Sequence, residues 1–509
     1  MSGQAGLERV QRIVIVGSGV AAWAAAASLA KVLGPAGRLR VVPAAETADA
    51  GYGGADSLLP LHDERLGCLR DAAAMLTAGD GSCGWGVAFD GWSPHARPWF
   101  LPFGSIGAGL GPVPFHQIVL RLRREGRAVR LADYSLPALA AQSGRFAWPG
   151  GPARSVLSTC RNALHLDVAA LADALRERAG AAGVMSSRAP FASAERAGDG
   201  RIAGIHTADG TRLGADLVLD CSETAVLSGR DPWEDWSPWL ACDRALAARV
   251  PRAADPPPYA LAEAHAAGWT RHLPLAHATS LVAFFNAARG GEAAALASLE
   301  RAGLAAEPDN VPLRFGRRRE PWRGNCVALG AAAARLDPLV VGNLHFLLTA
   351  LARLLELLPA EPRSPACARE YNRRTAAELD NARDQAIALY KTNGRRGEPF
   401  WDECRAMAVP DSLAYRLDTY ASRGKVVLYD EEPFDEAAWI ALFDEQGIAP
   451  PRNHPLADGF PIADLEAHLA RIRAILLDEL KRMPAHADHL ARVRAAERRP
   501  DNAAREALP

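Results

Sequence analysis

The feature that most constrains the fold of this chain is a glycine turn between a short β-branched run and a helical segment near the N-terminus. Residues 12–16 read RIVIV, and G-S-G-V-A-A-W follows directly. In a G-x-G-x-x-G/A turn the first glycine permits the tight bend, the second lets backbone approach a diphosphate, and the third small residue lets the helix pack close to the strand. These places are Gly17, Gly19 and Ala22 here, so the segment predicts binding of FAD or NAD(P). A glycine-rich turn in an unrelated α/β protein is the alternative.

A second short apolar run, Leu39 to Val42, comes one β-α-β step later and favours a Rossmann-like parallel sheet. The second strand of such a fold normally ends on an acid that binds the ribose hydroxyls. Here Pro43 follows the strand, and Glu46 could take that role only if the loop is remodelled. The sequence therefore predicts either weak cofactor binding or an adenosine that is held in a different way.

Composition and charge narrow the class of protein. The 509 residues are 49% hydrophobic and 23% charged, which is typical of a large globular protein with about three domain-sized units. The net charge of −1 gives no electrostatic reason to expect nucleic acid or an acidic membrane surface as partner. The eight cysteines form no C-x-x-C pair, which disfavours a metal site and suits a reducing compartment. Because glycines 17 and 19 interrupt the N-terminal apolar stretch, we expect a cytoplasmic enzyme without a membrane segment.

Later segments predict how the sheet is completed and where helices follow. Leu164 to Ala182 reads as an amphipathic helix, and Arg201 to Leu219 reads as a hairpin that returns to a final strand of the first sheet. Val327 to Leu358 reads as a long apolar helical region broken by Pro338, which cannot continue a helix. The restarted helix should point its N-terminus at the ligand. Between Leu465 and Leu480 apolar residues recur at three- and four-residue steps, which predicts a helix with one buried face.

Segments spread over almost the whole chain resemble, in the same order, the flavin-dependent tryptophan halogenases. The opening VIVGSGVAAW is similar to that family's VGGGTAGW. The match continues with ADLVLDCS at 215, FGRRREPWRGNCVALG at 315 and EPFWDECRAMAVPDSL at 398. The DCS and PDSL segments have no general structural reason to recur in this order, so the resemblance is specific.

This resemblance implies an α/β fold: a Rossmann-like FAD-binding domain of the flavoprotein monooxygenase and halogenase type with a mostly helical C-terminal substrate cap. The implied division is an FAD-binding core over residues 1–345, a helical cap over 346–495 and a tail over 496–509. The implied cofactor is FAD, reduced by a separate flavin reductase, and the implied partners are a small aromatic substrate and a second copy in a possible homodimer. The implied cofactor-binding residues are Gly17, Ser18, Gly19, Val20, Ala21, Ala22, Ala55, Ala331, Gly342, Asn343 and Leu344, and the substrate-side residues are Arg271 and His345.

The residues that carry the family's halogen chemistry are not preserved. In that family reduced FAD and oxygen convert chloride to hypochlorous acid, which travels through a tunnel to a lysine, while a glutamate helps to direct chlorination of the ring. By the resemblance, Gly84 stands in the place of the lysine and Val340 in the place of the glutamate. The halide-side turn falls on residues 342–343, and the family's G-V-G-E-A-T becomes GYGGAD over residues 51–56, which loses another acid. Glycine and valine can neither transfer a proton nor form a haloamine.

Four further residues have two readings each. Arg271 replaces the second tryptophan of the family's G-W-x-W-x-I-P; it could bind a carboxylate, or it could pair with a nearby acid. His345 could face the substrate or be a core histidine. Asp337 reads as the N-terminal cap of the restarted helix rather than as an acid catalyst. Cys83, beside the position of the missing lysine, could be a polarizable nucleophile, but it reads rather as a buried and inert thiol.

The leading hypothesis is a cytoplasmic FAD-dependent oxidoreductase that oxidises or hydroxylates an aromatic, indole-type substrate without ordinary halogenation. One alternative is a degenerate, non-catalytic relative that acts as a partner or scaffold. Another is a true halogenase with a relocated lysine. Lys391 and Lys425 are the candidates, because no lysine occurs between positions 31 and 391, and we expect both to be exposed. The catalytic residues stay unknown at this stage.

Overall fold

The chain forms two compact units, each assembled from three separate segments. The computed structural model describes residues 12–33, 39–44, 52–93, 97–152, 155–228, 232–358 and 365–497. Unit 1 comprises residues 1–80, 166–236 and 314–379, and unit 2 comprises residues 81–165, 237–313 and 380–509. This division does not coincide with the boundary expected after residue 345. Glu46 and the end of the expected tail lie outside the described residues.

Unit 1 is built on a six-stranded sheet in the order β20-β21-β12-β1-β2-β8. The first strand pairs in parallel with two neighbours, with Ile13 opposite both Leu39 and Leu217. The expected strand–turn–helix–strand opening and the late return to the first sheet are therefore confirmed. The bounds are β1 Ile13–Val16, β2 Leu39–Val42, β8 Met185–Ser186, β12 Leu217–Asp220, β20 Trp322–Arg323 and β21 Cys326–Ala328.

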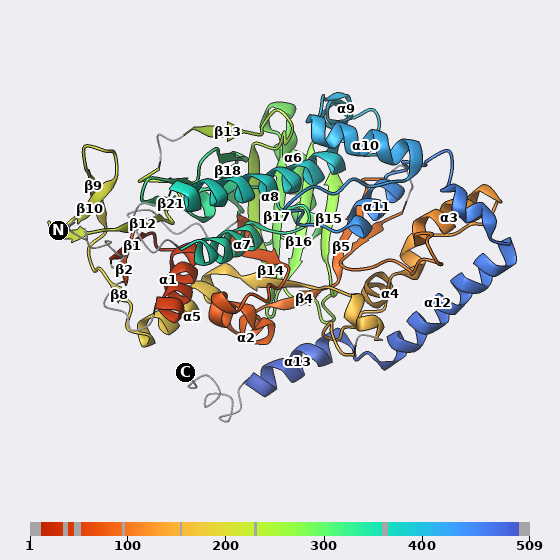
Figure 1. Cartoon of the computed structure of the whole chain (residues 1–509), viewed down its shortest axis with the longest axis horizontal. Coiled ribbons are helices and arrows are strands. Elements are labelled where there is room, and N and C mark those ends of the chain that lie inside the picture. The colour runs from red at the N-terminus through yellow and green to blue at the C-terminus, as the bar shows by residue number, and fades with distance from the viewer. Residues whose placement is uncertain are drawn as a thin grey trace, which may run out of the picture. The chain divides into compact units, whose positions relative to one another are not determined.

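Helices cover this sheet, and β1 is accordingly apolar and buried along its whole length. Helices α1 (Val20–Leu33) and α5 (Val168–Ala181) pack side by side, as Figure 1 shows. Helix α7 (Asn343–Glu356) contacts α1 and strand β3 (Ala55–Leu58). Unit 1 also contains η1 Tyr52–Gly54, η2 Glu64–Arg70, α2 Ala72–Ala78, β9 Phe191–Arg196, β10 Ile202–Thr207, β11 Arg212–Gly214, β13 Trp233–Asp235, β19 Gly316–Arg318, η6 Gly330–Ala332 and β22 Ala334–Arg335.

Two helix predictions were wrong in extent. The segment expected to be helical from Leu164 begins instead as strand β7 (Ala163–Asp167), and Asp167 then caps α5 by accepting a hydrogen bond from Ala170 N at 3.0 Å. The apolar region from Val327 forms short strands and a 3-10 turn before α7 begins at Asn343. In both segments the larger apolar residues are mostly buried, so their hydrophobicity reflects a sheet interior as much as a helix face.

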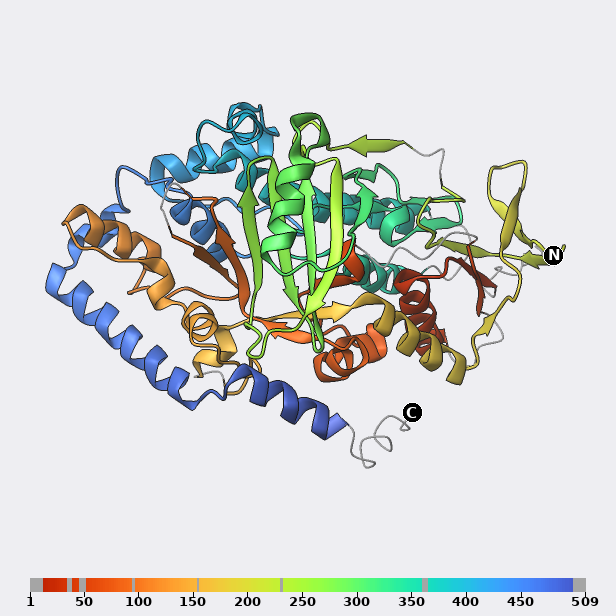
Figure 2. The same ribbon diagram turned by 180° about the vertical axis from the view of Figure 1, so that it is seen from behind.

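Unit 2 contains a seven-stranded sheet in the order β18-β14-β17-β16-β15-β5-β6, and helix α6 (Gly291–Arg301) lies against β16 and β17 (Figure 2). Its helices include α12, whose predicted buried face is confirmed because Leu465, Leu469 and Leu476 are buried. The strands are β4 Ser82–Gly84, β5 Gly86–Asp90, β6 Trp99–Pro102, β14 Arg244–Pro251, β15 Ala260–His265, β16 Gly268–Pro274, β17 Ala278–Phe285 and β18 Asp309–Pro312. The helices are α3 Phe115–Arg124, η3 Leu131–Tyr134, α4 Leu136–Gln142, η4 Val156–Thr159, η5 Ala287–Arg289, α8 Pro365–Lys391 (shared with unit 1), α9 Pro399–Ala406, α10 Asp411–Arg423, α11 Glu436–Glu445, η7 Pro455–Gly459, α12 Ile462–Arg482 and α13 His486–Glu497.

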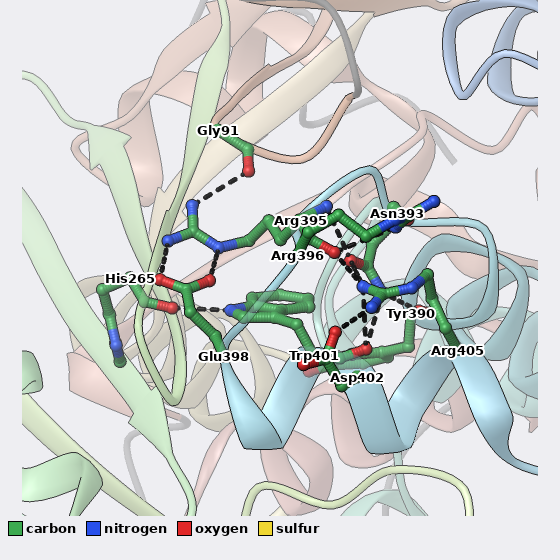
Figure 3. A network of polar contacts seen from close by, with 10 residues as sticks. All are labelled: Gly91, His265, Tyr390, Asn393, Arg395, Arg396, Glu398, Trp401, Asp402 and Arg405. Atoms are coloured by element: carbon green, nitrogen blue, oxygen red, sulfur yellow. Dashed lines mark hydrogen bonds and ion pairs between the residues drawn. The ribbon is translucent and has the colours of Figure 1, made fainter.

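A polar network in unit 2 fixes the loop between α8 and α9 (Figure 3). The Arg395 guanidinium forms an ion pair with Glu398 and donates to the carbonyl of Gly91 at 3.0 Å. It also lies over the Trp401 ring, 5.7 Å from the ring centroid. The indole N–H of Trp401 donates to the carbonyl of His265, the last residue of β15, at 2.7 Å. The network therefore anchors α9 on the sheet of unit 2.

The loop after β12 depends on one buried carboxylate. Asp220 accepts hydrogen bonds from the hydroxyls of Ser222 and Ser228, each at 2.5 Å, and from Leu227 N at 3.0 Å. We predict that Asp220→Ala lowers the free energy of unfolding by about 3 kcal/mol, because several buried donors lose their acceptor together. Urea denaturation measures the change. Asp209→Ala, which removes an exposed turn carboxylate that accepts from Thr211 N at 3.1 Å, should have a much smaller effect; equal losses would contradict this account.

Acid should destabilise the protein through four histidines of unit 2. Burial lowers the pKa of His165 to about 3 and those of His265, His486 and His489 to about 4. Between pH 6.5 and about 4 the unfolded chain therefore binds protons that the folded chain excludes, so stability falls as the pH falls. We expect up to about 1.4 kcal/mol of loss per pH unit from each histidine.

The test is urea denaturation at several pH values between 7.5 and 5. His489→Phe places a ring of similar shape beside Phe146 and Trp148. It should reduce the slope of the unfolding free energy against pH by up to about 1.4 kcal/mol per pH unit, the contribution of one proton. Ser186→Ala, at an exposed position that carries no titratable side chain, is the control and should leave the slope unchanged. A slope that His489→Phe does not alter would show that the acid sensitivity has another source.

Candidate functional site

The glycine turn lies at the carboxyl ends of three neighbouring strands of unit 1. Gly17 has a φ of +152° and donates from its N–H to the carbonyl of Val42 at 3.0 Å. A Cβ added at this position would lie 2.5 Å from the carbonyl oxygen of Cys221, so only glycine fits between β2 and the residue that follows β12. The hydroxyl of Ser18 donates to the carbonyl of Ala44 at 3.4 Å. These contacts direct the chain into α1, whose N-terminus is the diphosphate-binding end of such a fold.

A cavity in unit 1 opens beside this turn. Its walls are mostly small or aliphatic, and the N-terminal residues of α1 and α7 both contribute to it. The charged lining residues are Asp56, Glu223 and Arg335, and Arg335 pairs with Glu223 at 3.2 Å. The full lining is Val20, Ala21, Asp56, Val168, Glu223, Gly330, Ala331, Ala334, Arg335, Asn343, Leu344 and Leu347.

Most of the predicted cofactor residues gather around this cavity. Of the eleven, Val20, Ala21, Ala331, Asn343 and Leu344 line it. The others belong to the segments that supply these lining residues: Gly17, Ser18, Gly19 and Ala22 lie in the turn and in α1, Ala55 precedes Asp56, and Gly342 precedes Asn343.

The turn and the cavity fit a dinucleotide at the α1 end. The first turn of α1 carries no acidic side chain, so nothing on that helix repels a diphosphate. Gly330 has a φ of +60°, and a Cβ there would lie 3.0 Å from the Cβ of Ala21. A larger residue at position 330 would therefore narrow the cavity beside the first turn of α1.

The N-terminus of α7 is filled by a side chain that sequence reasoning did not select. Asp56, which is buried, accepts a hydrogen bond from Leu344 N at 2.9 Å. The helix has no side-chain cap at Gly342 and no acid in its first turn. The prediction that Asp337 caps this helix was therefore wrong, because α7 starts six residues after that aspartate. The alignment of residues 51–56 with the family's G-V-G-E-A-T contained the signal, since it placed an aspartate where the family has threonine.

The second predicted substrate-side residue, His345, lies in the first turn of α7 and is buried. Its ring packs edge-on against that of Phe346, with the ring centroids 5.3 Å apart. His345 is thus part of the same helix end as Leu344, but it does not line the cavity described above.

In unit 2 an imidazole covers Gly84, the position that the resemblance aligns with the family's lysine. Strands β4 and β7 pair antiparallel with Ser82 opposite His165, so Gly84 lies two residues along on the same face. A Cβ added at Gly84 would lie 2.5 Å from His165 Nε2. The Ser82 hydroxyl lies 3.4 Å from His165 Nδ1 and donates to the carbonyl of Pro274 at 2.6 Å. Burial, together with the charges of His486 and Arg271, lowers the pKa of His165 to about 3, so the imidazole is neutral.

The predicted substrate-side arginine lies on β16, a strand with buried residues on both of its faces. Arg271 is 3% exposed and alternates with Thr270 and His272, which point to the opposite face of the strand. On that opposite face His272 pairs with Glu263 at 3.2 Å. Arg271 contributes positive charge near His165, as its effect on the pKa of that histidine shows.

The other candidate nucleophiles and amines are held in structural roles. Burial raises the pKa of the Cys83 thiol far above its ordinary value, which supports the reading of an inert thiol. Lys391 was expected to be exposed, but it is half-buried and donates to the carbonyls of Arg405 at 2.6 Å and Met407 at 2.7 Å. Lys425 is exposed, as expected.

Among the residues that the structure describes, no group of three His, Cys, Asp or Glu side chains is arranged to hold a metal ion. Within the same residues, no helix combines the length and the apolar character needed to cross a bilayer.

Known proteins are similar to this chain in both sequence and fold. The family model described as tryptophan halogenase matches residues 12–462. Tryptophan 7-halogenase KtzQ of Kutzneria sp. (strain 744) is 27% identical over 439 residues, which cover 81% of this chain and 82% of that protein. The structure of BrvH, a flavin-dependent halogenase from Brevundimonas sp. BAL3, has a TM-score of 0.88 at 32% identity and covers 95% of this chain and 99% of its own. That of Xcc4156, a flavin-dependent halogenase from Xanthomonas campestris, has a TM-score of 0.88 at 33% identity with 96% and 99% covered. This chain belongs to the tryptophan halogenase family.

Proposed function

We propose that this protein is an FAD-dependent oxidoreductase that inserts oxygen into an aromatic, indole-type substrate and does not halogenate it. FAD, reduced by a separate reductase, supplies the activation of oxygen when it is bound. The observation that carries the proposal is the pair Gly84 and His165: the position of the family's lysine has no side chain, and a neutral imidazole covers it. The proposal includes a cytoplasmic location and leaves the oligomeric state to measurement.

The chain's own residues support the flavin part of this proposal through shape and charge. The turn at Gly17 admits close backbone approach, and α1 offers an N-terminus without acidic side chains. The cavity walls at Val20, Ala21 and Ala331 are apolar and suit an aromatic ring system. Since Pro43 follows β2, we expect the adenosine to lack the usual acid from that strand.

Packing as well as residue type supports the proposal that the family's halogen-transferring lysine and glutamate are lost. Val340 is 7% exposed and cannot hold or move a proton. Of the two candidate replacements for the lysine, Lys391 already donates to two carbonyls, and Lys425 is exposed. The His165 imidazole can accept a hydrogen bond in its neutral form, but it cannot form the stable haloamine of a lysine.

The second candidate function is a non-catalytic partner of an active relative. The specific observation that favours it is the carboxylate of Asp56 at the N-terminus of α7, in the same cavity as Glu223. Because Glu223 is paired with Arg335, the Asp56 carboxylate leaves the lining with a net negative charge, which disfavours an anionic ligand nearby. Titration with oxidised and reduced FAD separates the two functions, because a scaffold has no need of flavin.

Flavin binding should depend on the charge at the start of α1. We predict that Val20→Asp weakens FAD binding about tenfold or more, because a carboxylate at the first helical position repels the diphosphate, and about 1.4 kcal/mol is a factor of ten. The same change should leave thermal stability unchanged or slightly higher, since an acid suits a helix N-terminus. Flavin fluorescence during titration gives the dissociation constant, with Val20→Asn as the uncharged control.

If the unsubstituted protein binds neither oxidised nor reduced FAD, the catalytic proposal is wrong and the scaffold function takes its place. If Val20→Asn weakens binding as much as Val20→Asp does, the loss comes from shape rather than charge, and the placement of the diphosphate at α1 is wrong.

The reaction itself should give oxygenated and not halogenated products. We expect purified protein, supplied with reduced FAD, oxygen, bromide and a panel of indoles, to yield hydroxylated or oxidised product and no brominated product by mass spectrometry. With isotopically labelled oxygen gas, the label should appear in the product. Omitting the protein controls for oxidation by free flavin, and added catalase destroys leaked hydrogen peroxide before it can oxidise the substrate. Efficient bromination would overturn the proposal.

A further inference from the structure

The N-terminus of α7 takes its capping group from a distant part of unit 1. Strand β3 and the turn before α7 are joined by a backbone bond from Gly342 N to the carbonyl of Ser57 at 2.8 Å. Asp56 Oδ1 accepts from Ser57 N at 3.0 Å, which orients the carboxylate, and Oδ2 accepts from Leu344 N at 2.9 Å. A charged side chain from 288 residues away thus does what a local Ser, Thr or Asp usually does.

The fit between this carboxylate and the turn is unusually close. A Cβ at position 342 would lie only 1.4 Å from Asp56 Oδ1 and 2.1 Å from its Cγ, so no residue other than glycine leaves room for it. Asp56 is 5% exposed. The carboxylate therefore occupies the space at the start of α7, where a free anion would otherwise meet the helix N–H groups.

The net charge of the cavity lining depends on this carboxylate. Among the described residues that line it, the charged ones are Asp56, Glu223 and Arg335, and the last two form an ion pair with each other at 3.2 Å. Asp56 thus supplies the net negative charge of the lining, and the ends of α1 and α7 supply partial positive charge. Without Asp56 the lining would be close to neutral, and the α7 end would attract anions.

We propose that Asp56 is a built-in anion that fills a small-anion site at the N-terminus of α7 and thereby excludes free halide. Removal of its side chain should uncover a site for a monovalent anion such as bromide or chloride. The inference rests on the proposed function for its meaning in catalysis, because a protein that cannot hold halide beside its cofactor is left with oxygen chemistry. The anion site itself is a property of unit 1 and can be measured without substrate.

The experiment compares bromide binding by the full-length protein and its Asp56→Ala variant. Thermal unfolding is followed in sodium bromide against sodium gluconate at equal ionic strength, and chlorine NMR line broadening gives an independent readout in sodium chloride. We expect no saturable halide effect in the unsubstituted protein. We expect Asp56→Ala to show a saturable halide-specific rise in its unfolding temperature, because a ligand of the folded state stabilises it by mass action.

Two further variants keep the result interpretable. Asp71→Ala removes the exposed cap of α2, which accepts from Ala73 N at 3.0 Å, and should gain no halide effect. If Asp56→Ala does not fold, Asp56→Ser is titrated instead, because a serine hydroxyl caps a helix while leaving space for an anion.

Saturable halide binding by the unsubstituted protein would overturn the inference, and so would a folded Asp56→Ala or Asp56→Ser variant that binds no halide. A halide effect of equal size in Asp71→Ala would also overturn it, since any lost cap would then produce the signal. Because these titrations contain neither substrate nor flavin, they stand or fall apart from the oxygenation assay, and the failure of one proposal is distinguishable from the failure of the other.

Discussion

The close approach of the glycine turn to β12 is the contact on which the rest of unit 1 depends. A Cβ at position 17 would lie 2.5 Å from the carbonyl oxygen of Cys221, so any residue other than glycine would collide with it. Gly17 also binds the carbonyl of Val42 through its N–H. One position thus holds the ends of β1, β2 and β12 together, and α1 starts immediately after it. Because the cavity takes its walls from the first turn of α1, a shift of this turn would move the cavity as well.

The departures from the family's halogen chemistry share one physical form. At Gly84 and at Gly342 a missing side chain leaves space, and a polar side chain from another strand fills that space: His165 in unit 2 and Asp56 in unit 1. Protein interiors tolerate few voids, so the loss of a lysine or a larger turn residue is compensated by packing. These glycines therefore belong to a rebuilt interior rather than to a damaged one. This favours a changed activity over simple decay.

The local part of this architecture follows from the sequence, and the long-range part does not. The strand at 13–16, the turn at Gly17 and the buried face of α12 follow from spacing, because neighbours in the chain decide them. The start of α7 was misjudged, because an apolar run from Val327 onward is equally suited to a buried strand or helix. The Asp56 cap spans 288 residues and the His165 cover spans 81, so no local pattern announces either. Only the family alignment placed Asp56 and Gly84 in positions of interest.

The N-termini of α1 and α7 line the same cavity but differ in charge, and this difference determines where an anion can bind. The first turn of α1 carries no acidic side chain, whereas the start of α7 is occupied by a carboxylate. Both ends carry partial positive charge of similar size, since each helix has 14 residues. An anionic diphosphate is therefore favoured at α1, and α7 is closed to small anions. A variant with an acid at position 20 and none at position 56 should therefore disfavour the diphosphate at α1 and admit a small anion at α7. The two substitutions thus address a single electrostatic arrangement.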